Sequence, residues 1–242
     1  MMRLHEKPIC GYIPAGTVND FASSLRIPKI MRHAAELVTQ GKVFRCDLGS
    51  FNDKFFTYVA GFGAFTEVSY TTPQEWKNML GKTAYFIEGL KHLAEIKPHH
   101  MRITYDDGVV EDDFVLGLVS NSVSVAGYKA YQKEDIKMDD GLFEVLFIRD
   151  LKNALELQAV LNALLTKHLD ATKMFRCSSR HLHIVCDDEV QWTLDGEDGG
   201  SWDEVDLFNH QQVLPIICGD EALEDISSQI CLLYTSDAAD EL

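Results

Sequence analysis

The segment 14–21 reads Pro-Ala-Gly-Thr-Val-Asn-Asp-Phe and combines residue types that suit anion binding. Gly16 lies between an expected strand and an expected helix, where the absence of a side chain lets backbone amides approach an anion closely. Thr17 can offer a hydroxyl to a phosphate or nucleotide, and Asn19 and Asp20 can either cap the helix or face a ligand. The segment therefore indicates a phosphate contact, with an ordinary capped turn as the alternative.

A second segment, 192–200, places two carboxylates two residues apart at the end of an expected strand. Asp195 and Glu197 flank Gly196, and such a pair could provide a general base and a group that orients a metal ion or water. The Asp-Gly pattern is equally typical of a β-hairpin turn with solvated acids. Both interpretations stay open when this segment is taken alone.

A third segment, 137–143, reads Lys-Met-Asp-Asp-Gly-Leu-Phe. An aspartate carboxylate and backbone carbonyls in a turn suit a hard cation such as Mg²⁺. A solvated acidic turn without a bound ion explains the same pattern. The segment becomes informative only in combination with the other two.

The elements that would position the first segment form the start of an α/β unit. We expect a buried strand at 9–13, a short helix at 19–25 that Pro28 closes, and a second helix at 29–40 with Gly41 at its C-terminal cap. A parallel βαβ unit takes about 30 residues or more, and a lone first strand has no partner before it. We therefore interpret residues 1–42 as the remainder of a nucleotide-binding α/β domain that lacks residues at its front.

From residue 43 onward the pattern changes to many short strands, with Asp106-Asp107-Gly108 as a strong hairpin signal. Helices are expected at 83–96 and 151–165. Strands are expected at 43–48, 55–60, 101–105, 109–113, 114–120, 143–148, 181–186, 190–194, 205–208 and 213–218. Such a series is typical of a β-sandwich or a compact antiparallel domain. We place this domain at 43–212, with 213–230 returning toward the first domain and 231–242 as a non-native or disordered tail.

Composition excludes several classes of protein. The chain has 242 residues, 46% hydrophobic and 25% charged, with a formal net charge of -16. This charge disfavours nucleic-acid binding and a broad polybasic membrane patch. The six cysteines form no Cys-x-x-Cys pair and suit reduced thiols. A zinc site is not expected, because His181 and His183 alternate as strand residues do.

The three segments gain meaning from their order along the chain. The run Pro-Ala-Gly-Thr-Val-Asn-Asp-Phe is followed by Gly-Lys-Thr-Ala-Tyr at 81–85, Asp-Asp-Gly-Leu at 139–142 and Leu-Asp-Gly-Glu at 194–197. Together they resemble the bacterial diacylglycerol kinase-like lipid kinases, over about residues 9–215. The resemblance implies an N-terminal α/β domain related to that of NAD kinases, a C-terminal β-sandwich domain, and ATP in the cleft between them.

The resemblance also implies roles for the residues of the nucleotide site. Gly16, Thr17, Asn19 and Asp20 would form the cofactor-binding set, in which Thr17 contacts ATP and Asp20 helps to arrange metal and phosphates. Positioning and charge neutralisation would supply most of the catalysis, as in phosphoryl transfer generally.

For the acceptor side, the resemblance implies a catalytic base and a metal site. Glu197 or Asp195 would accept the proton of a lipid hydroxyl such as that of diacylglycerol. Asp140, with the backbone carbonyls of Lys137 and Leu142, would match a structural Mg²⁺ site. The implied partners are ATP and a lipid at the membrane surface, and the implied location is the cytoplasm, peripheral to the inner face of the membrane. A homodimer is one option for the oligomeric state.

Two departures from the family pattern matter. The family's Gly-Gly-Asp-Gly-Thr phosphate loop occurs nowhere in the chain, and Ala126-Gly127-Tyr128 stands where relatives often carry a Gly-Gly-rich turn. We therefore expect a truncated and impaired enzyme. The alternatives are a NAD kinase or sphingosine kinase relative, and a non-catalytic remnant that binds lipid or a partner. An acceptor pocket could include Phe62, Phe65 and Tyr85, although each also suits a plain hydrophobic core.

Overall fold

The computed structural model describes residues 8–16, 19–63, 96–121, 137–166 and 172–219. The chain divides into two compact units, one of Met1–Cys46 with Gln212–Leu242 and one of Asp47–Gln211. These divisions lie close to positions 42 and 212, where the sequence places its domain boundaries. None of the described helices is long and apolar enough to span a membrane.

The described residues of the first unit contain two helices and the outer ends of two strands. Helices α1 (Asp20–Ser24) and α2 (Met31–Gln40) lie within two residues of their predicted positions. The predicted strand at 9–13 is wrong, because only Cys10 bridges another strand, in parallel with Ile216. Ile9 and Ile13 are 58% and 47% exposed. Their apolar character indicated burial, but this short stretch makes only one pair of backbone hydrogen bonds, around Cys10.

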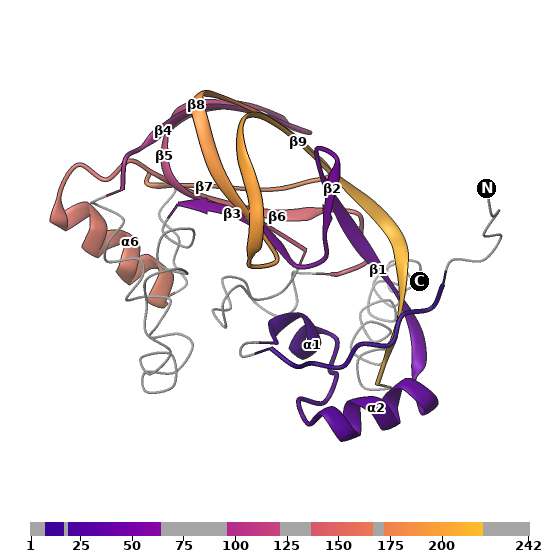
Figure 1. The fold of residues 1–242 in the computed structure, drawn as a ribbon. Coiled ribbons are helices and arrows are strands. Elements are labelled where there is room, and N and C mark those ends of the chain that lie inside the picture. The colour runs from indigo at the N-terminus through magenta and orange to yellow at the C-terminus, as the bar shows by residue number, and fades with distance from the viewer. Residues whose placement is uncertain (1–7, 17–18, 64–95, 122–136, 167–171, 220–242) are drawn as a thin grey trace, which may run out of the picture. The chain divides into compact units, whose positions relative to one another are not determined.

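The strands form one nine-stranded sheet in the order β2-β1-β9-β8-β3-β5-β6-β7, with β4 paired to both β5 and β8 (Figure 1). Their bounds are β1 (Lys42–Phe51), β2 (Lys54–Phe56), β3 (Val59–Gly63), β4 (His99–Tyr105), β5 (Gly108–Ser120), β6 (Phe143–Arg149), β7 (Met174–Ser179), β8 (His181–Leu194) and β9 (Glu197–Cys218). The hairpin predicted at Asp106-Asp107-Gly108 is confirmed as the turn between β4 and β5.

Within the second unit, β3 and β4 occupy the same place between β5 and β8 but at opposite ends of those two long strands. β4 pairs with the N-terminal halves of β5 and β8, and β3 pairs with their C-terminal halves. The strands close around one hydrophobic core whose centre contains Phe62 and Trp192, both fully buried with ring centroids 4.9 Å apart. Packing in this core fixes the C-terminal end of β8, next to the candidate site.

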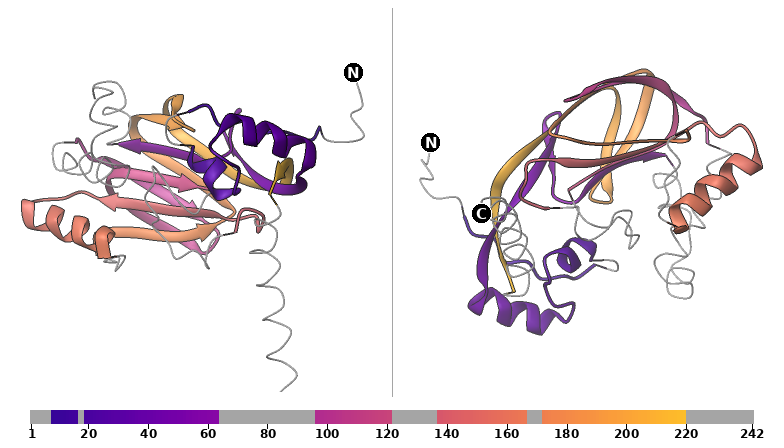
Figure 2. Two further views of the ribbon diagram at one scale, coloured as in Figure 1. Left: turned by 90° about the horizontal axis from the view of Figure 1, so that it is seen from below. Right: turned by 180° about the vertical axis from the view of Figure 1, so that it is seen from behind.

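Helix α6 (Ala154–Thr166) covers the opposite face of β5, β6 and β7, as Figures 1 and 2 show. Its buried Val160 and Leu164 join a second apolar cluster with Leu116, Leu146 and Met174 from the three strands. Because both faces of β5 are covered at its C-terminal half, residues 114–120 are continuously buried rather than alternating. The helix predicted at 151–165 is confirmed.

Several strand predictions need correction. The two strands predicted at 181–186 and 190–194 are one strand, β8, with a register shift between Val185 and Val190. Those predicted at 205–208 and 213–218 both belong to β9, and β7 was not predicted. The strand predicted at 55–60 is two strands, β2 and β3. The helix predicted at 83–96 lies outside the described residues except for Ile96.

Two adjacent histidines on β4 should titrate in opposite directions. Burial lowers the pKa of His99, whose ring lies edge-on to Phe62, below the ordinary value of 6.5. The hydrogen bond between His100 Nδ1 and Asp113 Oδ1, at 2.9 Å, raises the pKa of His100. The contribution of His100 to stability is therefore present below pH 6.5 and is lost as the pH rises toward its folded pKa. The contribution of His99 to stability is present above pH 6.5 and is lost as the pH falls toward the pKa of His99 in the folded state.

We expect an NMR titration to place the two imidazoles on opposite sides of 6.5. Asp113→Asn should lower the pKa of His100 and leave that of His99 in place. Coincident titration of the two rings in the unmodified chain would contradict the assignment.

Candidate functional site

The segment 192–200 forms the tip of the β8–β9 hairpin. Leu194 pairs with Glu197, so Asp195 and Gly196 are the two loop residues. Both have positive φ, 53° at Asp195 and 90° at Gly196. This is the backbone of a type I′ turn, which favours Asp or Asn followed by Gly. The turn therefore explains the Asp-Gly dipeptide by itself, and any chemistry must come from where the two carboxylates point.

The Asp195 carboxylate is fully engaged with the connection between β2 and β3. Its Oδ2 accepts hydrogen bonds from the Thr57 amide at 2.8 Å and the Thr57 hydroxyl at 2.9 Å. Its Oδ1 accepts from the amides of Tyr58 at 2.8 Å and Val59 at 2.9 Å. Three successive amides thus converge on one carboxylate, as in backbone nests that bind anions. This convergence explains why β2 and β3 are separate strands.

Glu197 is in a different position, although it lies only two residues away. It is exposed at the first position of β9, and its carboxylate makes no hydrogen bond or ion pair within the part of the chain that the structure describes. An exposed carboxylate with unused lone pairs can accept a proton from an incoming hydroxyl. Asp195 would have to give up existing contacts to do the same.

The start of β9 is fixed by further contacts that the sequence did not reveal. The carboxylate of Asp198 accepts hydrogen bonds from the Gly200 amide at 2.8 Å and from the Gln191 side chain at 2.7 Å, and these hold its pKa below the usual range. Lys54 Nζ donates to the carbonyl of Gly199 at 2.9 Å. These contacts fix the start of β9, the strand that carries Glu197, through Gln191 of β8 and Lys54 of β2.

The segment 137–142 forms a tight loop before β6. Gly141 has a φ of 82°, and the Asp140 carboxylate accepts a hydrogen bond from the Leu142 amide at 3.0 Å. Burial raises the pKa of both Asp139 and Asp140. Two half-buried acids side by side favour a nearby positive charge, because a cation would stabilise their ionised forms. The oxygen chemistry of this loop therefore fits a hard cation.

The loop would hold such a cation mainly through backbone oxygens. No group of three or more His, Cys, Asp or Glu side chains that could hold a metal ion occurs among the described residues. The predicted set combines the Asp140 carboxylate with the carbonyls of Lys137 and Leu142, so it does not depend on such a group. The neighbouring carbonyl, that of Asp139, accepts a hydrogen bond from Gln211 at 3.0 Å.

The glycine-containing segment lies in the other compact unit. Asn19, at a φ of 54°, accepts a hydrogen bond from the Gly16 amide at 3.0 Å and donates one to the Gly16 carbonyl at 2.6 Å. It makes no side-chain cap on α1, so its side chain closes the loop instead. Asp20 is buried, with 5% exposure. Thr17 lies outside the described residues, and the predicted nucleotide contacts of this segment stay a prediction.

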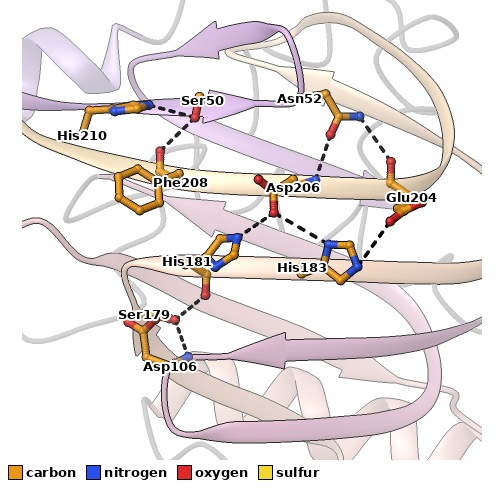
Figure 3. Close-up of polar contacts among 10 residues, drawn as sticks. All are labelled: Ser50, Asn52, Asp106, Ser179, His181, His183, Glu204, Asp206, Phe208 and His210. Carbon is orange, nitrogen blue, oxygen red and sulfur yellow. Dashed lines mark hydrogen bonds and ion pairs between the residues drawn. The ribbon is translucent and has the colours of Figure 1, made fainter.

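A histidine–carboxylate network lies on the outer face of β8 and β9 (Figure 3). His181 Nε2 lies 2.6 Å from Asp206 Oδ1, and His183 lies 3.7 Å from the same oxygen and 3.4 Å from Glu204. The side-chain oxygen of Asn52 accepts a hydrogen bond from the Asp206 amide at 2.8 Å, which fixes the backbone of Asp206. The two histidines share one face of a strand, as their spacing indicates. Because each imidazole already has a carboxylate partner, we assign this network no catalytic role.

Comparisons with known proteins cover most of the chain. The family model described as the YegS C-terminal NAD kinase beta sandwich-like domain matches residues 59–216, and the diacylglycerol kinase catalytic domain matches residues 1–51. The diacylglycerol kinase of Bacillus subtilis (strain 168) is 31% identical over 215 residues, which are 87% of this chain and 70% of that protein.

Two further relatives agree. The diacylglycerol kinase of Staphylococcus epidermidis (strain ATCC 12228) is 32% identical over 195 residues, 80% of this chain and 61% of that protein. A crystal structure of a diacylglycerol kinase from Bacillus anthracis strain Sterne is similar with a TM-score of 0.71 and 26% identity, over 90% of this chain and 71% of that one. The chain therefore spans roughly two thirds of the length of these relatives.

The different surroundings of the two hairpin acids predict different effects on stability. Asp195→Asn places an amide group against backbone donors, and we expect it to lower the free energy of unfolding by roughly 1–2 kcal/mol. Glu197→Gln removes no contact and should change that energy by less than about 0.5 kcal/mol. Urea denaturation monitored by Trp fluorescence measures both. Equal losses in the two variants would contradict the assignment of Asp195 as an anchor.

Proposed function

The chain belongs to the bacterial diacylglycerol kinase-like lipid kinase family, and from this premise we propose that it serves ATP-dependent phosphorylation of a lipid hydroxyl such as that of diacylglycerol. The observation that carries the proposal is the contrast within the β8–β9 hairpin. One acid, Asp195, is held by four hydrogen bonds, while the other, Glu197, is exposed at the first residue of β9. An anchored turn that presents a single available carboxylate suits general base catalysis.

In the proposed reaction, Glu197 accepts the proton of the lipid hydroxyl as its oxygen attacks the γ-phosphorus of ATP. The new bond joins the lipid oxygen to phosphorus, the bond to the β–γ bridging oxygen breaks, and ADP leaves with the electron pair. Asp195 acts as a positioning residue, because its contacts with Thr57, Tyr58 and Val59 fix the turn. Most of the rate enhancement would come from alignment and charge neutralisation.

On the nucleotide side, we propose contacts from Gly16, Thr17, Asn19 and Asp20. The family resemblance of this segment supports them. The double hydrogen bond between Asn19 and Gly16 supports a fixed loop conformation. It also means that Asn19 and the Gly16 amide contribute by holding the loop, since both are already engaged with each other. Direct contact with phosphates then falls to Thr17, with Asp20 arranging the metal.

For the metal, we propose that Mg²⁺ binds at Asp140 with the carbonyls of Lys137 and Leu142. When bound, the ion supplies positive charge that stabilises the ionised acids and the loop around them. The raised pKa of Asp140, caused chiefly by burial, supports this proposal because a bound cation would stabilise the ionised carboxylate.

The remaining parts of the proposal concern location and partners. The acceptor would be a lipid reached at the membrane surface, from a cytoplasmic position peripheral to the inner face, and a homodimer is one option. No Gly-Gly-Asp-Gly-Thr segment occurs in the 242 residues. Because that segment supplies most phosphate contacts in the family pattern, we propose that turnover by these residues alone is low.

Activity should depend on Glu197. We expect the chain, extended at its N-terminus by a segment that carries Gly-Gly-Asp-Gly-Thr, to phosphorylate lipid from radiolabelled ATP. Glu197→Gln should lower kcat by roughly 10²–10⁴-fold. Glu189→Gln, which removes an exposed acid on β8, is the matched control and should leave kcat unchanged. Diacylglycerol, undecaprenol, sphingosine and NAD as acceptors distinguish the lipid kinase from its alternatives. A Glu197→Gln enzyme at full rate would disprove the proposed base.

Mg²⁺ should stabilise the chain through Asp140. Binding to the folded state alone raises Tm in proportion to the logarithm of the free ion concentration above the Kd. We expect such a rise for the unmodified chain and for Asp107→Asn, an exposed turn acid between β4 and β5. Asp140→Asn should abolish it. The measurement is differential scanning calorimetry with Mg²⁺ from 0 to tens of millimolar; an undiminished response in Asp140→Asn would place the ion elsewhere.

A further inference from the structure

Four rings form a continuous row on the surface of β2, β9 and β8, away from the proposed site residues. Ring centroids are 6.2 Å apart between Phe55 and His210, 5.0 Å between His210 and Phe208, and 6.1 Å between Phe208 and His181. Phe55 is 63% exposed and Phe208 is 36% exposed. Single exposed apolar side chains are common on protein surfaces, but a contiguous group indicates an interaction surface. We call these four residues the aromatic row.

Strand register places the aromatic row. Phe208 and His210 are two residues apart on β9, so they point to the same side, and the residue between them is buried. His181 lies directly opposite Phe208 in the β8–β9 ladder (Figure 3). On the other side, Phe55 pairs with Ser50 of β1, whose hydroxyl oxygen lies 2.9 Å from His210 Nε2. The backbone of the sheet therefore holds the rings next to one another.

A guanidinium group lies against the aromatic row. Arg180 Cζ is 5.7 Å from the centroid of the Phe208 ring. The Arg180 backbone is fixed, because its amide donates to the Asp106 carboxylate at 2.6 Å and its carbonyl accepts from the Asn209 amide at 2.9 Å. The ring face stabilises the cation, and the forked N–H donors of a guanidinium suit a phosphate group. The surface thus combines apolar rings with one phosphate-binding side chain.

The charges around the aromatic row narrow the choice of partner. Asp206 lies 2.6 Å from His181 Nε2, exposed Asp53 lies close to Phe55 in the sequence, and the chain has a net charge of -16. These charges argue against a polybasic surface and against pairing of two copies, which would repel each other. A stable protein interface also buries roughly 20–30 residues on each side, far more than this row offers. Aromatic side chains instead concentrate at the level of the lipid headgroups, where no shape-complementary partner is needed.

We propose that the aromatic row, together with Arg180, is the surface by which the chain docks on a phospholipid bilayer. In the docked chain the two phenylalanine rings enter the boundary between headgroups and acyl chains. The imidazoles stay at the polar level, and the guanidinium group binds a lipid phosphate. The inference rests on the proposed function, in which the acceptor is a lipid at the membrane surface.

The docking surface is continuous in sequence with the anchor of the candidate site. Phe55 lies two residues before Thr57, whose amide and hydroxyl both donate to Asp195. Strand β2 therefore carries a membrane-facing ring and leads directly into the connection that fixes the Glu197 hairpin. Docking through β2 brings the bilayer to the strand that precedes this anchor.

The test measures how the full chain partitions onto vesicles of phosphatidylcholine and phosphatidylglycerol in a sedimentation assay. Phe55→Ser and Phe208→Ser each remove one ring and should lower the partition coefficient about 10-fold. Arg180→Gln should lower it about 5-fold, because it removes the group that binds phosphate. Leu155→Ser is the matched control, since Leu155 is 77% exposed on α6, outside the aromatic row. It should partition as the unmodified chain does.

A second readout distinguishes insertion from a general loss of stability. Phe55→Trp keeps an aromatic ring at the interface and should partition at least as well as the unmodified chain. Lipids with brominated acyl chains should quench its added fluorescence, whereas Trp192, at 0% exposure, stays protected. Far-ultraviolet circular dichroism checks that every variant is folded. Vesicle binding by Phe55→Trp without added quenching would contradict insertion of this ring.

The outcomes separate this inference from the proposed kinase activity. An unmodified chain that does not bind vesicles, or folded Phe55→Ser and Phe208→Ser chains that bind as well as it does, would overturn the docking surface. Variants that lose a dimer in analytical ultracentrifugation but keep vesicle binding would assign the aromatic row to contact between copies instead. If an extended chain phosphorylates no lipid while its partitioning still depends on both rings, only the proposed function is rejected.

Discussion

The carboxylate of Asp195 is the contact on which the geometry around the candidate site depends. Three successive amides, from Thr57 to Val59, point at it, and three neighbouring amides cannot point one way in a regular strand, where they alternate. The chain therefore leaves β2 and enters β3 in a new direction. β3 then pairs with β5 and β8, which places Phe62 in the centre of the core. The burial of the Phe62 ring and the conformation of the turn between β8 and β9 thus both depend on the Asp195 side chain.

The same contact separates the roles of two acids that the sequence presents as equivalents. Two residues that are two positions apart in one strand point to the same side and share neighbours. Asp195 and Glu197 have different neighbours because Asp195 lies in the turn, at positive φ, and Glu197 begins β9. The turn aims the first carboxylate back at the β2–β3 connection. The second carboxylate is exposed and makes no hydrogen bond or ion pair to the described residues. Asp195, with four hydrogen bonds, therefore stabilises the turn, whereas Glu197 is the acid to which we assign the proposed role of base.

Sequence patterns correctly predicted features that depend on interactions between residues close together in the chain. The predicted family and fold class, an α/β nucleotide-binding part followed by a β-sandwich domain, are confirmed by the family models and by the similar crystal structure. The hairpin at Asp106-Asp107-Gly108 was predictable because a turn needs only adjacent residues. Strands β8 and β9 were each predicted as two pieces, since polar residues at Asp187 and Asn209 interrupt the apolar alternation. In the structure each is a single strand, and β8 has a register shift against β9 between Val185 and Val190.

The supporting contacts of the site could not be predicted because they join distant parts of the chain. Asp47 hydrogen-bonds to Gly141, which is 94 residues away in the sequence, and Asp195 hydrogen-bonds to Thr57, which is 138 residues away. Nothing in the sequence around Asp47 distinguishes it from the other acids, and most of those that the structure describes are exposed. Only burial reveals it, because a carboxylate inside a core must have partners, and those partners are backbone amides whose positions the fold alone determines. Motif spacing can therefore suggest candidate reactive side chains, while the side chains that support them become visible only when the strands are assembled.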